Sequence, residues 1–377
     1  MAIPSSSFNT SSWHYHLMNK DEIVLEFRIL KGFDYSIEEV KKFTDKVPIG
    51  FTDISTWVHS RQAPKHREYI EVLLNLCQIN NIKDFLNITY ALSLNDCFWV
   101  KPIDSKLNWK DVSLYSNDFN ESITHLAFNG EGLYGLDVTT TSPEFGTDGS
   151  FAKCWVKDDN DSIYLLKRGS HGFCNSGLEP YSEFYASQVS KEICESFVNY
   201  DLIKYHKELA CSCKLFSNEE IGYTPIINVL GRSKSVDEII KYFDSIGSGE
   251  LLRSMIVLDG VIVNTDRHLN NYGVLFNNEN LELLGMAPVF DNNMSLLPYA
   301  MEDDFKNLEA YLTDKGPKFG GDWIEVARFC LTPRLRKILN NLYGFRFLKH
   351  SEFNLSDERL EFLNKLVNSQ IREILKN

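Results

Sequence analysis

NTDRHLNNYG, residues 264–273, is the most informative segment of this 377-residue chain, and PVFD follows it at residues 288–291. The first segment places Asp266 five residues before Asn271, and the second segment ends in Asp291. A carboxylate can accept the proton of a hydroxyl group, and carboxylate and amide oxygens are ligands that Mg²⁺ prefers in proteins. The two segments therefore predict a site at which a proton acceptor and a metal ion lie together.

The surroundings of these segments make the spacing more specific. An Asp and an Asn five residues apart occur by chance about once in a chain of this length. Here a helix-like apolar run at 251–263 leads into the polar loop, and two strand-like segments follow at 272–276 and 281–284. This order is similar to that of protein kinases, in which the Asp is the catalytic base and the Asn and the later Asp bind the metal. The alternative is a turn-rich surface loop that only contains polar residues.

Groups that hold the phosphates of a nucleotide are expected upstream of this site. Residues 162–166 (SIYLL) are typical of a strand, which would place Lys167 beside the α- and β-phosphates of ATP. A helix pattern at 181–197 carries Glu183 in its first turn, and we expect Glu183 to pair with Lys167. Two further acidic residues are alternative partners, Glu179 and Glu192.

A glycine-containing loop precedes this strand. Residues 144–153 (EFGTDGSFAK) lie between strand-like segments at 138–141 and 154–156. Glycine has no Cβ, so backbone N–H groups in this loop could approach phosphate oxygens closely. The alternative is an ordinary turn. We assign to the phosphate site the loop residues with glycine, hydroxyl or ammonium groups: Gly146, Thr147, Gly149, Ser150 and Lys153.

Four strings taken together are similar to the motifs of one kinase family. The resemblance is to the HipA family of bacterial toxin-type serine/threonine kinases, and it is carried by GTDGSFAK, LLK, NTDRHLNNYG and APVFDNNMSL. It extends from about Thr139 to the C-terminus. The resemblance implies that Asp266 is the catalytic base and that Asn271 and Asp291 bind Mg²⁺. It also implies that Lys167 contacts ATP.

The resemblance further implies ATP and Mg²⁺ as cofactors, a protein substrate, a bacterial setting, and a small DNA-binding antitoxin as a partner. Family members phosphorylate a hydroxyl group in their own phosphate loop, and Thr147 and Ser150 are the hydroxyls available here. This chain departs from the family loop at Gly146 and Ala152, where a serine and a glutamine are usual.

The segment 207–216 (KELACSCKLF) resembles the strand that enters the adenine-binding hinge of kinases. The resemblance implies that Cys213, Lys214 and Phe216 lie against adenine. We also assign His268 to the nucleotide site, as a hydrogen-bonding residue that shapes the catalytic loop. No second histidine stands at a metal-ligand spacing from His268, which argues against a zinc or iron site.

The charge of the chain bears on its partners. It has 39 Lys and Arg residues against 52 Asp and Glu residues, a formal net charge of −13. Phosphoinositide kinases share the Asp-Arg-His sequence, so a lipid substrate is an alternative, but anionic lipid surfaces attract basic proteins. We expect no membrane binding and no direct nucleic-acid binding. No apolar run approaches 18 residues, and the eight cysteines form no CxxC pair, which favours a cytoplasmic protein with reduced thiols.

We predict an α+β, bilobal protein-kinase-like fold in three parts. A mainly helical N-terminal module spans residues 1–130, a strand-rich N-lobe spans 131–214, and a mostly helical C-lobe spans 215–377. Helical periodicity in the N-terminal module is found at 37–43, 54–59, 68–76 and 82–92. In the C-lobe, after the metal-binding segment, it is found at 305–313, 322–329, 334–342 and 357–375.

The sequence leaves more than one function open. We favour ATP- and Mg²⁺-dependent transfer of the γ-phosphoryl group to a serine or threonine of a protein, and to the chain itself, because Asp266, Asn271 and Asp291 are all present. One alternative is a nucleotide-binding regulator, or pseudokinase, that binds ATP without transferring phosphate. Another is a phosphotransferase that acts on a lipid or a small molecule.

Overall fold

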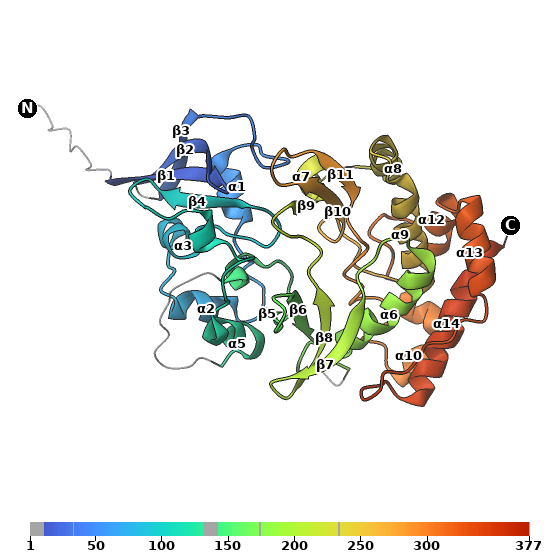
Figure 1. Ribbon diagram of the computed structural model, residues 1–377. Helices are drawn as coiled ribbons and strands as arrows, with labels where there is room; N and C mark the ends of the chain where they lie inside the picture. The colour runs from blue at the N-terminus through green and yellow to red at the C-terminus, as the bar shows by residue number, and fades with distance from the viewer. Residues whose placement is uncertain (1–10, 33, 132–141, 173–174, 233, 377) are drawn as a thin grey trace, which may run out of the picture.

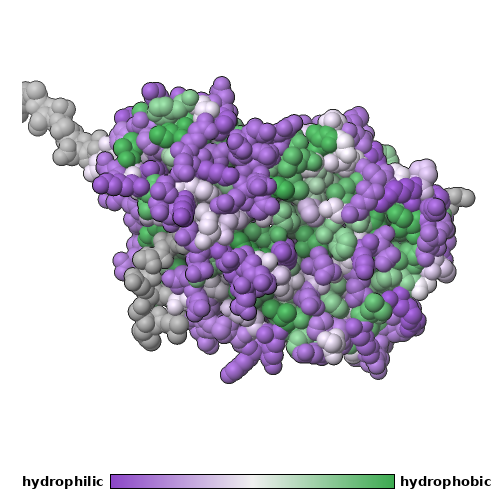
Figure 2. Space-filling view, viewed as in Figure 1, coloured by the Kyte–Doolittle hydropathy of each residue, from purple (hydrophilic) through white to green (hydrophobic). Residues whose placement is uncertain are grey.

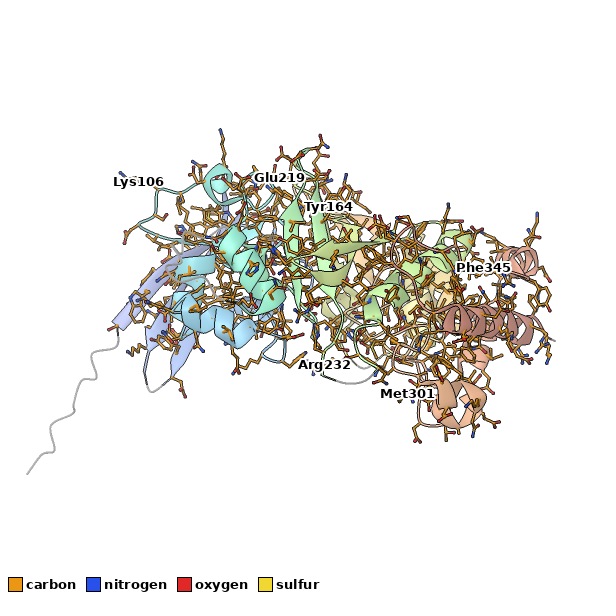
Figure 3. All side chains as sticks on the ribbon, turned by 90° about the horizontal axis from the view of Figure 1, so that it is seen from below. Lys106, Tyr164, Glu219, Arg232, Met301 and Phe345 are labelled. Atoms are coloured by element: carbon orange, nitrogen blue, oxygen red, sulfur yellow. The ribbon has the colours of Figure 1, made fainter. Side chains whose placement is uncertain are left out.

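The computed structural model describes residues 11–32, 34–131, 142–172, 175–232 and 234–376. It confirms the α+β class. Figure 1 shows one sheet near the N-terminal end (blue), two further sheets in the middle of the molecule, and a group of helices at the C-terminal end. Figure 3 views the molecule from below. Phe345 lies far from the N-terminal sheet, and Tyr164, in one of the two middle sheets, lies between them. Within the described ranges, no helix combines the length and the apolar character that crossing a membrane requires.

The N-terminal module contains an antiparallel sheet with the strand order β3-β2-β1-β4. Its strands are β1 (Ser11–Asn19), β2 (Glu22–Lys31), β3 (Tyr35–Lys42) and β4 (Phe98–Pro102). Its helices are α1 (Ile54–Ser60), α2 (Ile70–Leu76), α3 (Ile82–Thr89), α4 (Trp109–Val112) and α5 (Glu121–Asn129). Leu25, Phe27 and Ile29 alternate along β2 and are fully buried with apolar residues of the helices, so this face joins the sheet to the helices.

The N-terminal module is therefore mixed and not mainly helical. The helix predicted at 37–43 is wrong, because these residues lie in or directly after β3, which pairs with β2. Most of β3 is exposed, and its sequence lacks the alternation of apolar and polar residues that marks a half-buried strand. Pairing with β2, the strand directly before it in sequence, sets the conformation of β3 in place of a local apolar pattern.

The other three helices predicted in the module are confirmed by α1, α2 and α3. Asp53 precedes α1, and its carboxylate accepts a hydrogen bond from the backbone N–H of Thr56. Asn81 caps α3 in the same way, through the N–H of Asp84. Such caps satisfy N–H groups that have no partner inside the helix, which explains where these helices begin.

The second sheet has the order β5-β6-β8-β7 and forms one side of the site described below. Its strands are β5 (Lys153–Lys157), β6 (Ile163–Arg168), β7 (Tyr200–Tyr205) and β8 (Glu208–Lys214). Helix α6 (Glu179–Ile193) packs on β7 and β8 and also on α9, so it links the sheet to the C-terminal helices. The predicted strand at 162–166 and helix at 181–197 are confirmed with slightly different ends. The strand predicted at 138–141 lies outside the described residues.

The third sheet has the order β11-β10-β9. Its strands are β9 (Ile221–Pro225), β10 (Gly273–Asn277) and β11 (Leu283–Met286). Three helices lie between β9 and β10 in sequence: α7 (Ile226–Leu230), α8 (Val236–Ser245) and α9 (Gly249–Ile262). The predicted helix, polar loop and hairpin are confirmed, although the second strand begins two residues later than the predicted segment.

The C-terminal helices are α10 (Glu302–Lys306), α11 (Leu308–Leu312), α12 (Trp323–Phe329), α13 (Pro333–Leu342) and α14 (Asp357–Leu375). One helix predicted at 305–313 is two short helices, α10 and α11. Helix α9 is apolar on nearly all sides and lies in the centre of this part, where it packs against α12 and α14. Central burial on all sides explains its long apolar run.

Hydrophobic contacts cross the predicted domain limits. Phe145, which follows the limit at residue 130, packs in the core of the N-terminal module. Ile163 of β6 packs with Met18 of β1 and Trp99 of β4. The limits at residues 130 and 214 remain predictions, but the N-terminal module and the second sheet share an apolar core.

Candidate active site

A buried network holds the loop that follows α9. Val263 comes directly after the helix in a left-handed conformation (φ 53°), which turns the chain away from the helix axis. Asp259 of α9 accepts hydrogen bonds from the side chains of Arg267 and Asn264, both at 3.0 Å. The Oδ1 atom of Asn264 accepts in turn from the backbone N–H of Asp266 at 3.0 Å. The network therefore fixes the backbone at Asp266.

Arg267 connects this loop with the segment after β11. It is 2% exposed. Its guanidinium donates to the carbonyl oxygens of Asn271, at 3.1 Å, and Phe290. It also donates to the Oδ1 atom of Asn292 at 2.6 Å. Because one side chain contacts both segments, the loop with Asp266 and the segment with Asp291 are held in a fixed relation.

Asp266 lies half-buried on the surface of a cleft. The Nε2 atom of His268 and the Nζ atom of Lys318 each lie 3.8 Å from its carboxylate. Burial raises the pKa of Asp266, and the nearby charges of His268 and Lys318 oppose this rise. A carboxylate with a raised pKa is a stronger proton acceptor than an exposed aspartate. The Nδ1 atom of His268 accepts from the N–H of Asn270 at 3.3 Å, a contact within the loop.

Asn271 and Asp291 line the same cleft. The Nδ2 atom of Asn271 donates to the carbonyl oxygen of Asp266 at 2.9 Å, so its Oδ1 atom is the one available to a cation. Asp291 has a left-handed backbone (φ 60°), and its N–H donates to the hydroxyl of Tyr200 at 3.2 Å. This conformation is uncommon for aspartate and is found at functional sites. An amide oxygen with a carboxylate fits Mg²⁺, which takes the rest of its ligands from phosphates and water.

Lys167 lies between two carboxylates. Its Nζ atom is 2.7 Å from Oε1 of Glu183 and 2.8 Å from Oδ1 of Asp291. Burial alone would lower the pKa of Lys167, but the carboxylates of Asp291 and Glu183 raise it well above its ordinary value. Burial opposes ionisation of Asp291, yet the ammonium of Lys167 holds the pKa of Asp291 well below its usual range. Both groups are therefore charged at neutral pH.

Among the three acidic residues of α6 considered for this role, Glu183 is the partner of Lys167. Its second oxygen, Oε2, accepts from the N–H of Asn292 at 2.7 Å. Glu179 instead accepts from the hydroxyl of Tyr299 at 2.6 Å. Glu183 is fully buried and does not line the cleft, so it would act on a nucleotide only through Lys167.

The glycine-containing loop folds over the side chain of Lys153. The Nζ atom of Lys153 donates to the carbonyl oxygen of Asp148 at 2.7 Å. Gly149 has a φ of +94°, which favours glycine, and a Cβ atom there would lie 2.1 Å from this Nζ atom, so another residue would displace the end of the Lys153 side chain. Burial, helped by the positive charges of Lys167 and Arg67, lowers the pKa of Lys153 to about 7. A bound anion would favour its charged form.

The end of β8 and the residues directly after it form one end of the cleft. Cys213, Lys214 and Phe216 all line it. The ring of Phe216 packs against Tyr223 and Phe290, with centroid distances of 5.3 and 5.4 Å. Aromatic side chains with a few polar groups are typical of small-molecule sites and suit a flat base.

One cleft of about 370 Å³ brings these groups together. Its volume falls within the range of ligand sites. Figure 2 shows that hydrophobic residues (green) gather near the middle of the face in view, while most of the surrounding surface is hydrophilic. The cleft is lined by every predicted site residue except Glu183: Gly146, Thr147, Gly149, Ser150, Lys153, Lys167, Cys213, Lys214, Phe216, Asp266, His268, Asn271 and Asp291.

Sequence analysis missed several residues of the cleft. The cleft is also lined by four residues of the N-terminal module: His66, Ser93, Leu94 and Asn95. Nothing in their local sequence relates them to the glycine-containing loop, which is distant in sequence. Lys318 beside Asp266 was also missed. In the sequence, Lys318 is marked only by its position in a glycine-rich segment between two predicted helices. Asp259 had a clearer signal, since a carboxylate within the apolar run of a helix requires a buried partner.

Comparison with known proteins was informative only at the level of structure. No protein-family model matches the chain, and no significant match is found among curated proteins. The HipA chain of the Shewanella oneidensis MR-1 toxin–antitoxin complex of HipA, HipB and operator DNA is similar over 95% of this chain and 96% of its own length, with 11% identity and a TM-score of 0.52. The Helicobacter pylori proinflammatory kinase CtkA matches over 59% of this chain and 92% of its own length, with 16% identity and a TM-score of 0.44.

The similarity to the HipA structure extends beyond the part of the chain that carries the sequence motifs. Those motifs begin at about Thr139, whereas the structural match covers 95% of the chain and so includes most of the N-terminal module. At this level of identity the similarity concerns the path of the backbone. The chain has a HipA-like fold.

Proposed function

We propose that this protein is an ATP- and Mg²⁺-dependent serine/threonine protein kinase of the HipA type. One observation carries the proposal: Lys167, the loop with Asp266 and Asn271, and Asp291 come from separate segments of the chain but line one cleft. Within it, Lys167 is paired with Glu183 as the phosphate-contacting lysine of a kinase is paired with a helix glutamate. The HipA-like fold supports the same assignment.

The cleft residues provide the groups that phosphoryl transfer requires. Asp266 orients the acceptor hydroxyl and takes up its proton, and its raised pKa suits this role. Asn271 and Asp291 hold Mg²⁺, which supplies positive charge to the phosphates when it is bound. Lys167 and the loop at 146–153 position the phosphates, and the hinge holds adenine. Positioning and charge provide most of the catalysis in this reaction class.

The two hydroxyls available for self-phosphorylation differ in their contacts. The Oγ1 atom of Thr147 donates to the carbonyl oxygen of Pro143 at 2.8 Å and accepts from the indole N–H of Trp155 at 2.9 Å. Ser150 is exposed and lines the cleft. We therefore propose Ser150 as the acceptor, because phosphorylation of Thr147 would first have to break two hydrogen bonds.

A small DNA-binding partner belongs to the same proposal. The similar HipA structure is a complex with HipB and operator DNA. The formal net charge of −13 of this chain disfavours direct binding to DNA, so a basic partner protein would provide the DNA contacts. Purification of the chain from its own cells, followed by identification of bound proteins, tests this part of the proposal separately.

The experiment that tests the activity compares the unaltered protein with Asp266→Asn. Purified protein is incubated with Mg²⁺ and ATP, alone and with a bacterial lysate, and phosphorylated residues are mapped by mass spectrometry. We expect phosphate on serine or threonine, and a loss of at least about 10²-fold in rate for Asp266→Asn, which removes the proton acceptor. ATP affinity should change little, because Asp266 faces the acceptor.

Other outcomes identify the alternatives. ATP binding without transfer to this chain or to lysate proteins would indicate a nucleotide-binding regulator. Transfer only to aminoglycosides, nucleosides or lipids, offered in parallel assays, would indicate a phosphotransferase of another class. An Asp266→Asn variant as active as the unaltered protein would contradict the role of Asp266.

A further inference from the structure

The N-terminal module contacts the phosphate loop through two consecutive residues that precede α2. Arg67 and Glu68 lie outside the part of the chain that carries kinase motifs. The loop begins in a short 3₁₀ turn, η1 (Pro143–Gly146), and ends at β5. Arg67 is 3% exposed and contacts both of these elements.

Arg67 holds the two ends of the loop together. Its Nη2 atom is 2.8 Å from Oε2 of Glu144, in η1, and donates to the carbonyl oxygen of Lys153, in β5, at 2.9 Å. Its Nη1 atom donates to the carbonyl oxygen of Glu144 and, at 3.4 Å, to that of Thr147. Glu144 is fully buried and also accepts from the N–H of Trp155 at 2.7 Å. One guanidinium therefore contacts the beginning, middle and end of the loop.

Glu68 connects the loop with the strand that carries Lys167. Its backbone N–H donates to the carbonyl oxygen of Ser150 at 2.9 Å. Its carboxylate accepts from the N–H of Ala152 at 3.3 Å and from the guanidinium of Arg168 at 3.1 Å. Arg168 follows Lys167 on β6. Glu68 thus links two elements that would contact the same phosphates.

The N-terminal module also reaches the hinge end of the cleft. The carbonyl oxygen of Leu94 accepts from the hydroxyl of Ser217 at 2.5 Å, and that of Asn95 accepts from the N–H of Tyr223 at 2.7 Å. His66, next to Arg67, lines the cleft itself. The module therefore touches the cleft at both ends, in addition to sharing an apolar core with the second sheet.

We propose that Arg67 and Glu68 are positioning residues for the nucleotide phosphates, so that the N-terminal module is a component of the ATP site. The inference rests on the proposed function. Backbone N–H groups bind phosphate well only when the loop that carries them is already held in the binding conformation. Here the groups that hold it come from another part of the chain.

The test measures affinities for ATP and for adenosine, by calorimetry or displacement of a fluorescent nucleotide. Glu68→Ala removes the acceptor of the Ala152 N–H and of Arg168, and Glu68 is partly exposed, so this variant should fold. We expect about tenfold weaker ATP binding and adenosine binding within twofold of the unaltered protein, because adenosine lacks phosphates. Glu68→Gln keeps one acceptor oxygen and should recover much of the ATP affinity.

A second variant tests Arg67. Arg67→Met combined with Glu144→Gln removes both buried charges together and leaves an amide oxygen for the N–H of Trp155. We expect the same selective loss of ATP affinity. In the absence of nucleotide, the backbone amides of residues 144–153 should exchange hydrogen faster in both variants than in the unaltered protein. This readout does not depend on catalysis. Arg28→Met is the matched control, since Arg28 pairs with Glu38 at 2.9 Å on the exposed side of the N-terminal sheet.

The outcomes separate this inference from the proposed function. If the unaltered protein transfers phosphate but both variants bind ATP as tightly as it does, the inference alone is overturned. Equal losses of ATP and adenosine affinity would also overturn it, because they would show general damage to the cleft. If the unaltered protein binds no ATP, the proposed function fails and the inference fails with it.

Discussion

Lys153 is a residue of the cleft whose charge changes near neutral pH. Its side chain is buried beneath the phosphate loop, and its pKa is lowered to about 7. Above this pH the free protein holds mainly the neutral amine. A phosphate group in the loop favours the ammonium, so nucleotide binding and protonation of Lys153 are linked.

We predict that binding of ATP at pH 8 takes up a proton, and that ATP affinity falls as the pH rises above about 7. Calorimetric titrations in two buffers with different ionisation enthalpies measure the number of protons taken up. Lys153→Met should remove this uptake, because it leaves no amine to protonate. Equal binding enthalpies for the unaltered protein in both buffers would contradict the prediction.

At the scale of the element, the conformation of the loop at 144–153 depends on one glycine. Gly149 is left-handed (φ +94°), and its missing Cβ leaves the space that the Nζ atom of Lys153 occupies. Any other residue would strain the backbone and displace Lys153. These are separate effects, because the strain acts on stability and the displacement acts on the anion site.

We predict that Gly149→Ala lowers ATP affinity by about tenfold and stability by about 1–2 kcal/mol. Gly344→Ala is the control for the strain, since Gly344 has the same φ of +94° but no atom within 4 Å of its missing Cβ. The control should lose similar stability and keep its ATP affinity. Urea denaturation and nucleotide titration of both variants check the prediction, which fails if the two variants have the same ATP affinity.

At the scale of the whole molecule, Lys167 joins three parts of the fold. Its backbone lies in β6, while its ammonium contacts Glu183 of α6 and Asp291 after β11. The side chains of Lys167 and Glu183 are 11% and 0% exposed, so water screens this pair little. Without Lys167, the buried carboxylate of Glu183 and the partly exposed carboxylate of Asp291 would lose the positive charge that lies between them.

We predict that Lys167→Met lowers the free energy of unfolding by about 3–5 kcal/mol at neutral pH, the usual cost of leaving buried charge uncompensated. Asp291→Asn in the same chain should restore part of this loss, because it removes one of the two carboxylates. Urea denaturation of the single and double variants measures the coupling.

Lys241→Met is the control for the loss of a lysine. Lys241 forms an exposed pair with Asp237, and its replacement should cause no measurable change. A Lys167→Met protein as stable as this control would contradict the role given to Lys167.

The local sequence predicted the elements around the cleft better than it predicted the N-terminal module. Helix α9 is an apolar run with a clear end, and the spacing of Asp266 and Asn271 lies within one loop, so neighbours in sequence set both features. Strand β3 has no such signal, because most of it is exposed and its conformation depends on pairing with β2. Helical periodicity at 37–43 was therefore misleading.

By itself the sequence determined which chemical groups are present and in what order. They are a lysine on a strand, a helix that carries glutamates, an aspartate with an asparagine five residues later, and a second aspartate. Local periodicity and short spacings are sufficient for this, since they depend on neighbouring residues. Only the tertiary structure decided that Glu183 pairs with Lys167, that Arg67 and Glu68 hold the phosphate loop, and that Lys318 lies beside Asp266. These contacts join residues far apart in the chain, and the packing of the cores brings them together.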